Sequence, residues 1–104
     1  MSLTTDYEEI DSLILLREIA EIINYRIITS TMYSAKTVLQ ISTENKLPLS
    51  STYKKMSRLC KAGILSVDRA SIDSNGKKVL YYKSKIRAIE ASLNNNGLAV
   101  RVKK

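Results

Sequence analysis

The chain has 104 residues and a net charge of +7, and 44% of its residues are hydrophobic, which is typical of one globular domain with a small core. No apolar run approaches the ~20 residues of a membrane-spanning helix, and no secretory signal is recognisable. Histidine is absent and Cys60 is the only cysteine, so the commonest general base and the usual metal ligands are missing. We therefore expect neither an enzyme nor a cofactor or metal site, and a cytoplasmic location without membrane contact.

The charge is distributed unevenly along the chain. Residues 1–21 carry a net charge of −5, whereas residues 22–104 carry +12. Between residues 45 and 87, 11 basic residues stand against two acidic ones. A positive surface of this kind attracts phosphates, although a basic surface that only contacts solvent is the plainer alternative.

The N-terminal segment predicts a long amphipathic helix. Thr5 and Glu8 fit a capping box, and the helix is expected to run to about Ile23. Its apolar residues cover more than half of its circumference: Ile10, Leu13, Ile14, Leu15, Leu16, Ile19, Ala20 and Ile23. Such a helix needs cover on two sides, so we expect its own domain on one side and a dimer partner on the other.

Two shorter helices are expected next. The segment 24–26 predicts a bend before a helix that ends near Met32. Ser34 is a candidate N-cap for another helix, with Tyr33 packed against Val38. The inner face of that helix would consist of Ala35, Val38, Leu39 and Ser42. Leu47 would then fill the turn that follows.

A basic helix follows the only proline, Pro48. It is expected over about Ser50–Ala62, with Ser50 as the N-cap and Gly63 as the left-handed residue that ends it. Thr52, Met56 and Leu59 recur at spacings of four and three, which marks its inner face. Two helices with a short connection, the second of them basic, predict a helix-turn-helix over about 34–62.

A β-hairpin is expected over about 64–82. Residues 64–72 are rich in β-branched and small residues, and 77–82 can return as the second strand. The turn between them, Asp73-Ser74-Asn75-Gly76, contains the strongest short hairpin signal. Basic residues flank this tip, so the hairpin is a candidate DNA-contacting wing.

The C-terminal extension, 84–104, allows two interpretations. Ile86, Ile89 and Leu93 have helical spacing, which would suit a dimerisation helix. Against this, 94–97 repeats the Asn-Gly turn signal, and residues 98–103 alternate apolar and other side chains as a strand does. The pattern favours a second hairpin.

The stretches 41–65 and 73–85 resemble winged helix-turn-helix transcription regulators, specifically the small ArsR-like regulators of archaea. The matching features are Ile41-Ser42, Leu47-Pro48, Ser51-Thr52-Tyr53-Lys54, Leu59 with Gly63, and Gly76-Lys77. The resemblance, looser before residue 34, covers about residues 24–85. It implies binding of double-stranded DNA as a dimer, with the second helix in the major groove. Lys46 stands where the family often has glycine, and the metal-sensing cysteine and histidine clusters are absent, so metal sensing is not implied.

Candidate DNA-binding residues follow from the resemblance and from the basic side chains. On the recognition helix they are Ser50, Ser51, Tyr53, Lys54, Lys55, Ser57 and Arg58. On the wing they are Arg69, Asn75, Lys77 and Lys78. Lys36 and Thr37 could contact phosphates of the DNA backbone, and a solvent-exposed helix face without such a contact is an equal alternative. Lys61 is expected to contact solvent near the helix end, and Cys60 to be a partly buried filler more than a redox switch.

The sequence as a whole predicts one α+β domain, a winged helix-turn-helix of three to four helices with a β-hairpin wing and a second C-terminal hairpin. Its expected function is sequence-specific binding of double-stranded DNA to regulate transcription. The expected homodimer would form through the N-terminal helix, the C-terminal segment, or both. The alternative is a winged-helix module that binds a protein in a transcription or replication complex.

Overall fold

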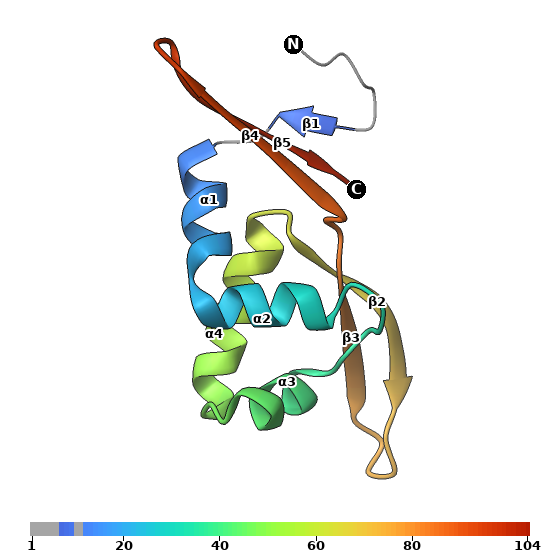
Figure 1. Cartoon of the computed structure of the whole chain (residues 1–104). Coiled ribbons are helices and arrows are strands. Elements are labelled where there is room, and N and C mark those ends of the chain that lie inside the picture. The colour runs from blue at the N-terminus through green and yellow to red at the C-terminus, as the bar shows by residue number, and fades with distance from the viewer. Residues whose placement is uncertain (1–6, 10–11) are drawn as a thin grey trace.

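The computed structural model describes residues 7–9 and 12–104 and shows an α+β protein with four helices and two antiparallel β-hairpins (Figure 1). The molecule is elongated, with extents of 55 × 26 × 19 Å. None of the helices in the described part is long and apolar enough to cross a membrane. The elements in order are β1 (Tyr7–Glu9), α1 (Ser12–Ala20), α2 (Ile22–Ser30), α3 (Val38–Asn45), α4 (Leu49–Lys61), β2 (Leu65–Ile72), β3 (Lys78–Ser84), β4 (Ala88–Asn94) and β5 (Gly97–Lys103).

The N-terminal helix begins later than the sequence predicted. Glu8, expected in its first turn, lies in β1 and pairs with Val102 of β5, and α1 begins at Ser12. Thr5, the expected cap, lies outside the described residues. The long-range pairing with β5 places this segment in a sheet, so a tertiary contact overrides its local helix propensity.

The bend between the first two helices lies at Glu21, so the prediction of a bend at 24–26 is wrong. Glu21 is the N-cap of α2, and its carboxylate accepts hydrogen bonds from the backbone amides of Ile23 (3.1 Å) and Asn24 (2.9 Å). A glutamate is not among the preferred N-cap residues, which explains why the cap signal was not recognised.

The next helix, α3, begins after Thr37, so the prediction of a start at Ser34 is wrong. Thr37 and Gln40 form a capping box there, and Tyr33 is 89% exposed and does not staple. Residues 31–34 form a turn and bends, and the backbone of Lys36 pairs with that of Tyr82 in β3, so this segment stays outside the helix. The inner face of α3 contains the predicted Val38 and Ser42 together with Ile41, while Leu39 points outward, 66% exposed.

A three-residue turn joins α3 to α4. Lys46 adopts the left-handed conformation there (φ 53°, ψ 44°), at the position where the resemblance suggested a glycine. The backbone carbonyl of Leu47 accepts the Ser42 hydroxyl at 2.7 Å, which closes the turn. Pro48 is the N-cap of α4 without a side-chain hydrogen bond, so the expected cap at Ser50 is not formed.

Replacing Lys46 by glycine should stabilise the protein by about 0.5–1 kcal/mol. The left-handed conformation costs a non-glycine residue about 1–2 kcal/mol, and the extra freedom of glycine in the unfolded chain offsets part of that gain. Urea unfolding with an unchanged m-value would measure the effect. Lys46→Ala is the matched control, because it removes the same charge and keeps the strain. Equal stabilities of the two variants would contradict this explanation.

The inner face of α4 is confirmed, since Thr52, Met56 and Leu59 are at most 2% exposed. Gly63 ends the helical segment with φ +77°, as predicted. Beyond it the chain passes directly into β2, whose first residue, Leu65, is also buried. The basic helix is therefore fixed to the core along its inner side and at its C-terminal end.

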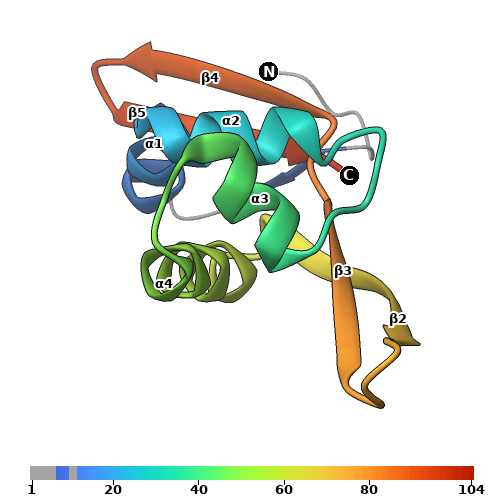
Figure 2. The ribbon, with the colours of Figure 1, turned by 90° about the horizontal axis from the view of Figure 1, so that it is seen from below.

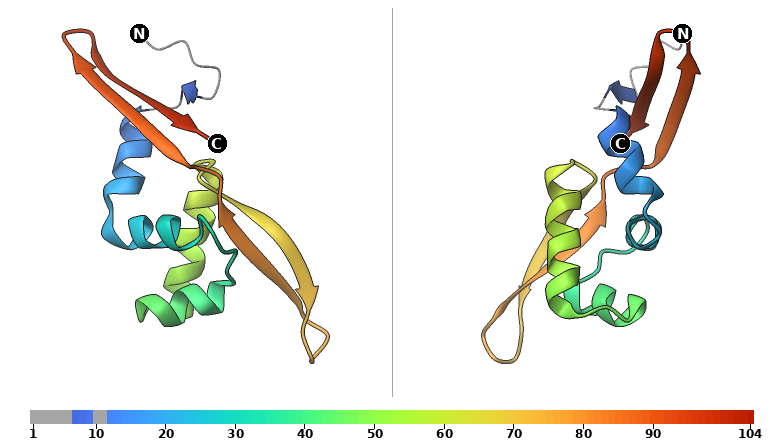
Figure 3. Two further views of the ribbon diagram at one scale, coloured as in Figure 1. Left: turned by 45° about the vertical axis from the view of Figure 1, so that its right-hand side comes forward. Right: turned by 90° about the vertical axis from the view of Figure 1, so that its left-hand side faces the viewer.

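Both hairpins are present, and the helical alternative for residues 84–104 is wrong. Strands β2 and β3 pair with a bulge between Val67 and Arg69, and β4 pairs with β5 in unbroken register across the turn between Asn94 and Gly97. β1 adds to the other side of β5, giving a sheet of order β1-β5-β4. The two hairpins extend toward opposite ends of the molecule (Figure 3).

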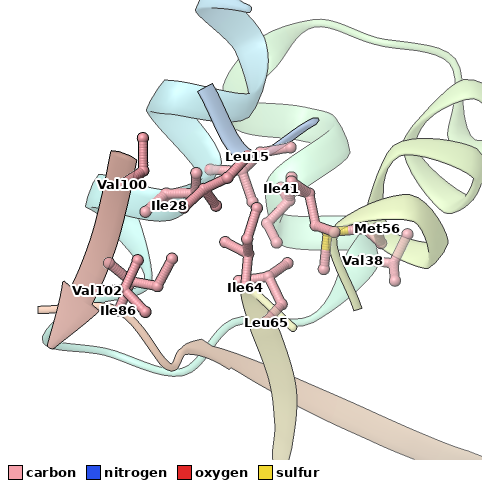
Figure 4. Packing of buried hydrophobic residues seen from close by; sticks show 12 residues of the cluster. Leu15, Ile28, Val38, Ile41, Met56, Ile64, Leu65, Ile86, Val100 and Val102 are labelled. Carbon is pink, nitrogen blue, oxygen red and sulfur yellow. The ribbon is translucent and has the colours of Figure 1, made fainter. Parts of the chain in front are cut away.

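The core lies between the four helices and the bases of the hairpins (Figure 4). Its residues come from every helix, the start of β2, the β3–β4 link and β5: Leu15, Ile27, Ile28, Val38, Ile41, Met56, Leu59, Ile64, Leu65, Ile86, Val100 and Val102. Seen from below, α3 and α4 lie beside one another with the β2–β3 hairpin projecting next to them (Figure 2). This arrangement places one side of α4 and one strand of the hairpin around a shared groove.

Candidate nucleic-acid interface

The exposed face of α4 is a narrow polar stripe. Residues three or four apart lie on one side of a helix, and the outermost such series is Ser50, Lys54, Ser57 and Lys61, all exposed. It lies opposite the buried line of Thr52, Met56 and Leu59. Lys61, expected only to contact solvent near the helix end, lies on the same stripe as Lys54 and Ser57.

A groove opens between the helices and the hairpin. It has a volume of about 600 Å³, and residues from α3 and its cap, from α4 and from the β2–β3 turn and β3 line it. Tyr53 of α4, which is 56% exposed, lines it, and so do Lys77 and Lys78 of the hairpin. The groove thus brings Tyr53 together with two predicted site residues that lie 24 and 25 positions further along the chain, Lys77 and Lys78.

Two other predicted residues of α4 point elsewhere. The Lys55 ammonium lies 3.1 Å from the Glu21 carboxylate, and the Arg58 guanidinium lies 3.1 Å from that of Glu18. Ser51, half-buried, lies on this same side of the helix. The structure therefore pairs Lys55 and Arg58 with acidic residues of α1 and of the α2 cap, and gives the two basic residues a role in helix packing.

Glu18 is the buried centre of this contact. It is only 6% exposed, and besides Arg58 it accepts a hydrogen bond of 3.0 Å from the side-chain amide of Asn24. Glu21 is more exposed. Partial burial acts to raise its pKa, but the backbone amides of Asn24 and Ile23 and the Lys55 ammonium outweigh this and hold the pKa below its ordinary value. The cap and its ion pair therefore remain charged at neutral pH.

The tip of the hairpin is internally braced. The Asp73 carboxylate accepts hydrogen bonds from the backbone amides of Asn75 (2.8 Å) and Lys77 (2.9 Å), which is an Asx-turn. Asn75 is exposed at this tip, and the neighbouring Lys77 and Lys78 side chains project from a rigid support. Such preorganisation lowers the entropic cost of binding a ligand.

Arg69 is held over a neighbouring aromatic ring. Its guanidinium lies 4.0 Å from the centre of the Tyr81 ring, a cation–π contact, and 3.8 Å from the Asp68 carboxylate. Arg69 is still exposed, so it can reach a phosphate, but its position is determined by the hairpin itself. Tyr82, by contrast, packs partly against the core.

The residues at the start of α3 have structural roles. The Lys36 ammonium is ion-paired with Glu44 at 2.6 Å, and the hydroxyl of Thr37 caps the helix. Thr37 also lines the groove. Cys60 is half-buried and burial raises its pKa, with Lys85 opposing the shift, so the thiol stays protonated at neutral pH. Within residues 7–9 and 12–104 no group of three or more His, Cys, Asp or Glu residues could hold a metal ion.

Sequence reasoning missed Glu18 and Glu21 as the partners of α4, and Asn24 as the residue that donates a hydrogen bond to Glu18. The available signal was the opposite charge of residues 1–21 and of the basic helix. Ion pairs between residues 34 and 40 positions apart depend on how the helices pack, and a count of charges along the sequence does not contain that information.

The fold and the site define an α+β protein that presents two short-linked helices and a basic hairpin around one groove. Comparison of the sequence with protein-family models and with curated proteins finds no match. The function must therefore be inferred from the geometry of this groove and of the α4 stripe.

Proposed function

We propose that the chain is a winged helix-turn-helix protein that binds double-stranded DNA in a sequence-specific manner and regulates transcription as a homodimer. In this assignment α3 and α4 are the helix-turn-helix, α4 is the recognition helix, and β2–β3 is the wing. The observation that carries the proposal is the groove itself, with Tyr53 on one wall and Lys77 and Lys78 on the other.

The exposed stripe of α4 suits the major groove. That groove is about 12 Å wide and admits a helix, and its base edges accept hydrogen bonds from serine and lysine side chains. Ser50, Lys54 and Ser57 would read base edges, with Tyr53 beside them. Because Lys55 and Arg58 are paired with Glu21 and Glu18, they are not part of the proposed interface.

The wing would contact the DNA backbone. Lys77 and Lys78 beside the groove, and Arg69 and Asn75 on the hairpin, can bind phosphates, which position a protein on DNA without specifying sequence. All residues of the α4 stripe and of the wing tip, residues 73–77, are exposed. The proposed mechanism is occupancy: the bound protein blocks or recruits the polymerase at a promoter.

A titration of duplex DNA at several salt concentrations tests the proposal. Two wing lysines per protomer, bound to phosphates in a homodimer, predict a slope of log K against log salt of about −4 or steeper. Selection from random duplexes should then yield a two-fold symmetric motif. Binding that is absent, or that does not change with salt, would contradict DNA binding and favour a protein-interaction module that uses the same surface.

A further inference from the structure

The outer edge of β4 is open. In the sheet β1-β5-β4, β5 pairs on both sides, and no strand among the described residues pairs with the other side of β4. β4 is seven residues long, and its register with β5 is unbroken. Proteins protect exposed edges with lysines, prolines or bulges. β2 has a bulge and an arginine, whereas β4 has no bulge, lysine or proline.

β4 also presents a neutral, partly apolar surface in a strongly basic chain. Its only charged residue, Glu90, is ion-paired with Arg101 of β5. Ile89 is 38% exposed and Leu93 is 79% exposed, and both lie on the same face of the strand as Ala91. A second copy of this chain could approach here without bringing like charges together, even though each copy carries a net charge of +7.

We propose that β4 pairs with β4 of a second copy, antiparallel and about a two-fold axis at Ala91. This register sets Ala91 opposite the partner's Ala91 and Ile89 opposite the partner's Leu93. It also sets Glu90 opposite the partner's Ser92, so no like charges are opposed. The strand is thus self-complementary under two-fold symmetry, which is the requirement for an isologous interface and the reason to assign a second copy as the occupant.

The backbone geometry fits the same axis. Asn94 and Gly97 are paired across a two-residue turn, so hydrogen bonding to β5 alternates from Asn94 back along β4. The amides of Ile89, Ala91 and Leu93 then face the open edge, where a partner strand would bond them. The two three-stranded sheets would become one continuous sheet with no open β4 edge.

Pairing through β4 leaves the proposed DNA surface accessible. The C-terminal hairpin and the tip of β2–β3 lie at opposite ends of the molecule (Figures 1 and 3). The β4 pairing names the interface of the homodimer in the proposed function, and it rests on that proposed homodimer. Its test uses protein without DNA, so loss of DNA binding and loss of the dimer are seen separately.

Cysteine cross-linking tests the register directly. In a Cys60→Ala background, Ala91→Cys should form a disulfide-linked dimer on mild oxidation, because hydrogen-bonded antiparallel pairs have Cα atoms about 5.5 Å apart. Ser92→Cys is the matched control. Ser92 is also exposed, but in this register the two Ser92 residues of the dimer are diagonal neighbours about 7–8 Å apart, so the variant should remain unlinked. Equal cross-linking of the two variants, or none at position 91, would overturn the register.

Sedimentation without a cysteine probe tests the interface itself. The unaltered chain should be dimeric, and Ala91→Lys should raise its dimer dissociation constant at least about tenfold, because it opposes two like charges at the axis. Ala99→Lys, at an exposed position of neighbouring β5, should leave that constant unchanged. A monomer at ~100 μM would overturn the proposal. So would a dimer that Ala91→Lys spares and Leu13→Lys disrupts, since Leu13 lies on the exposed side of α1.

Discussion

Reversing the charge of Lys54 and Lys77 together is expected to weaken binding to duplex DNA by about 100-fold or more at ~0.1 M salt. Lys54 lies on the exposed stripe of α4, and Lys77 lies on the hairpin wall of the groove. Neither is in an ion pair recorded for the described residues. Each glutamate therefore replaces an attraction to DNA by a repulsion without breaking a contact within the protein. Fluorescence anisotropy of a labelled duplex would measure the loss.

The control is a second double reversal with the same change in net charge. Arg26 of α2 and Arg87, just before β4, are also exposed, and both lie outside the groove. Arg26→Glu with Arg87→Glu should change the affinity by no more than about threefold, the residual effect of net charge at a distance. If both pairs of substitutions weaken binding equally, the attraction is a property of the total charge, and the groove is not the interface. Circular dichroism would verify that all variants remain folded.

Replacing Arg58 by alanine is expected to lower the free energy of unfolding by about 2 kcal/mol and to leave DNA affinity unchanged. Removing one partner of a buried ion pair costs about 3–5 kcal/mol, because the other charge stays buried without compensation. Glu18 is buried here, but the Arg58 side chain is 64% exposed, so solvent screens part of the interaction and we take a smaller value. Urea unfolding and the DNA titration give the two readouts.

A double-mutant cycle separates the loss of the pair from the loss of packing. Glu18→Gln removes the buried charge and keeps the shape of the side chain, so adding it to Arg58→Ala should recover part of the lost stability. Additive losses in the cycle would show that Arg58 acts only through its aliphatic part. A large loss of DNA affinity in a stable Arg58→Ala protein would instead return Arg58 to the DNA interface.

Helix α4 shows how far sequence reasoning reached. The spacing of Thr52, Met56 and Leu59 correctly identified the inner face of α4, and Gly63 correctly marked its end. These features are local, because helix periodicity and the left-handed glycine depend on neighbouring residues alone. The same local pattern marked Lys55 and Arg58 only as exposed and basic, and their partners on α1 and α2 were not predictable from it.

The helix starts were the least accurate predictions. Ser34, Ser50 and Thr5 are good caps by residue type, yet α3 is capped by Thr37, α4 begins behind Pro48, and Glu8 pairs with β5. In each case a long-range backbone pairing or a cap at a neighbouring residue determines where the helix begins. The Lys36–Tyr82 pairing, for example, holds Lys36 outside the helix that follows it. A cap is worth only about 1 kcal/mol, so one backbone pairing or a few buried side chains are enough to move it.

The sequence by itself determined the α+β class, the first hairpin and the inner line of α4, and it favoured the second hairpin over a helix, because turns and periodicity are encoded over a few neighbouring residues. Only the tertiary structure decided which basic residues remain available to a ligand. Arg58 and Lys55 meet acidic residues 40 and 34 positions away, while Lys54 and Lys77 remain beside the groove. Electrostatic contacts depend on distance in space, and that distance is set by the packing of Leu15, Met56 and the rest of the core.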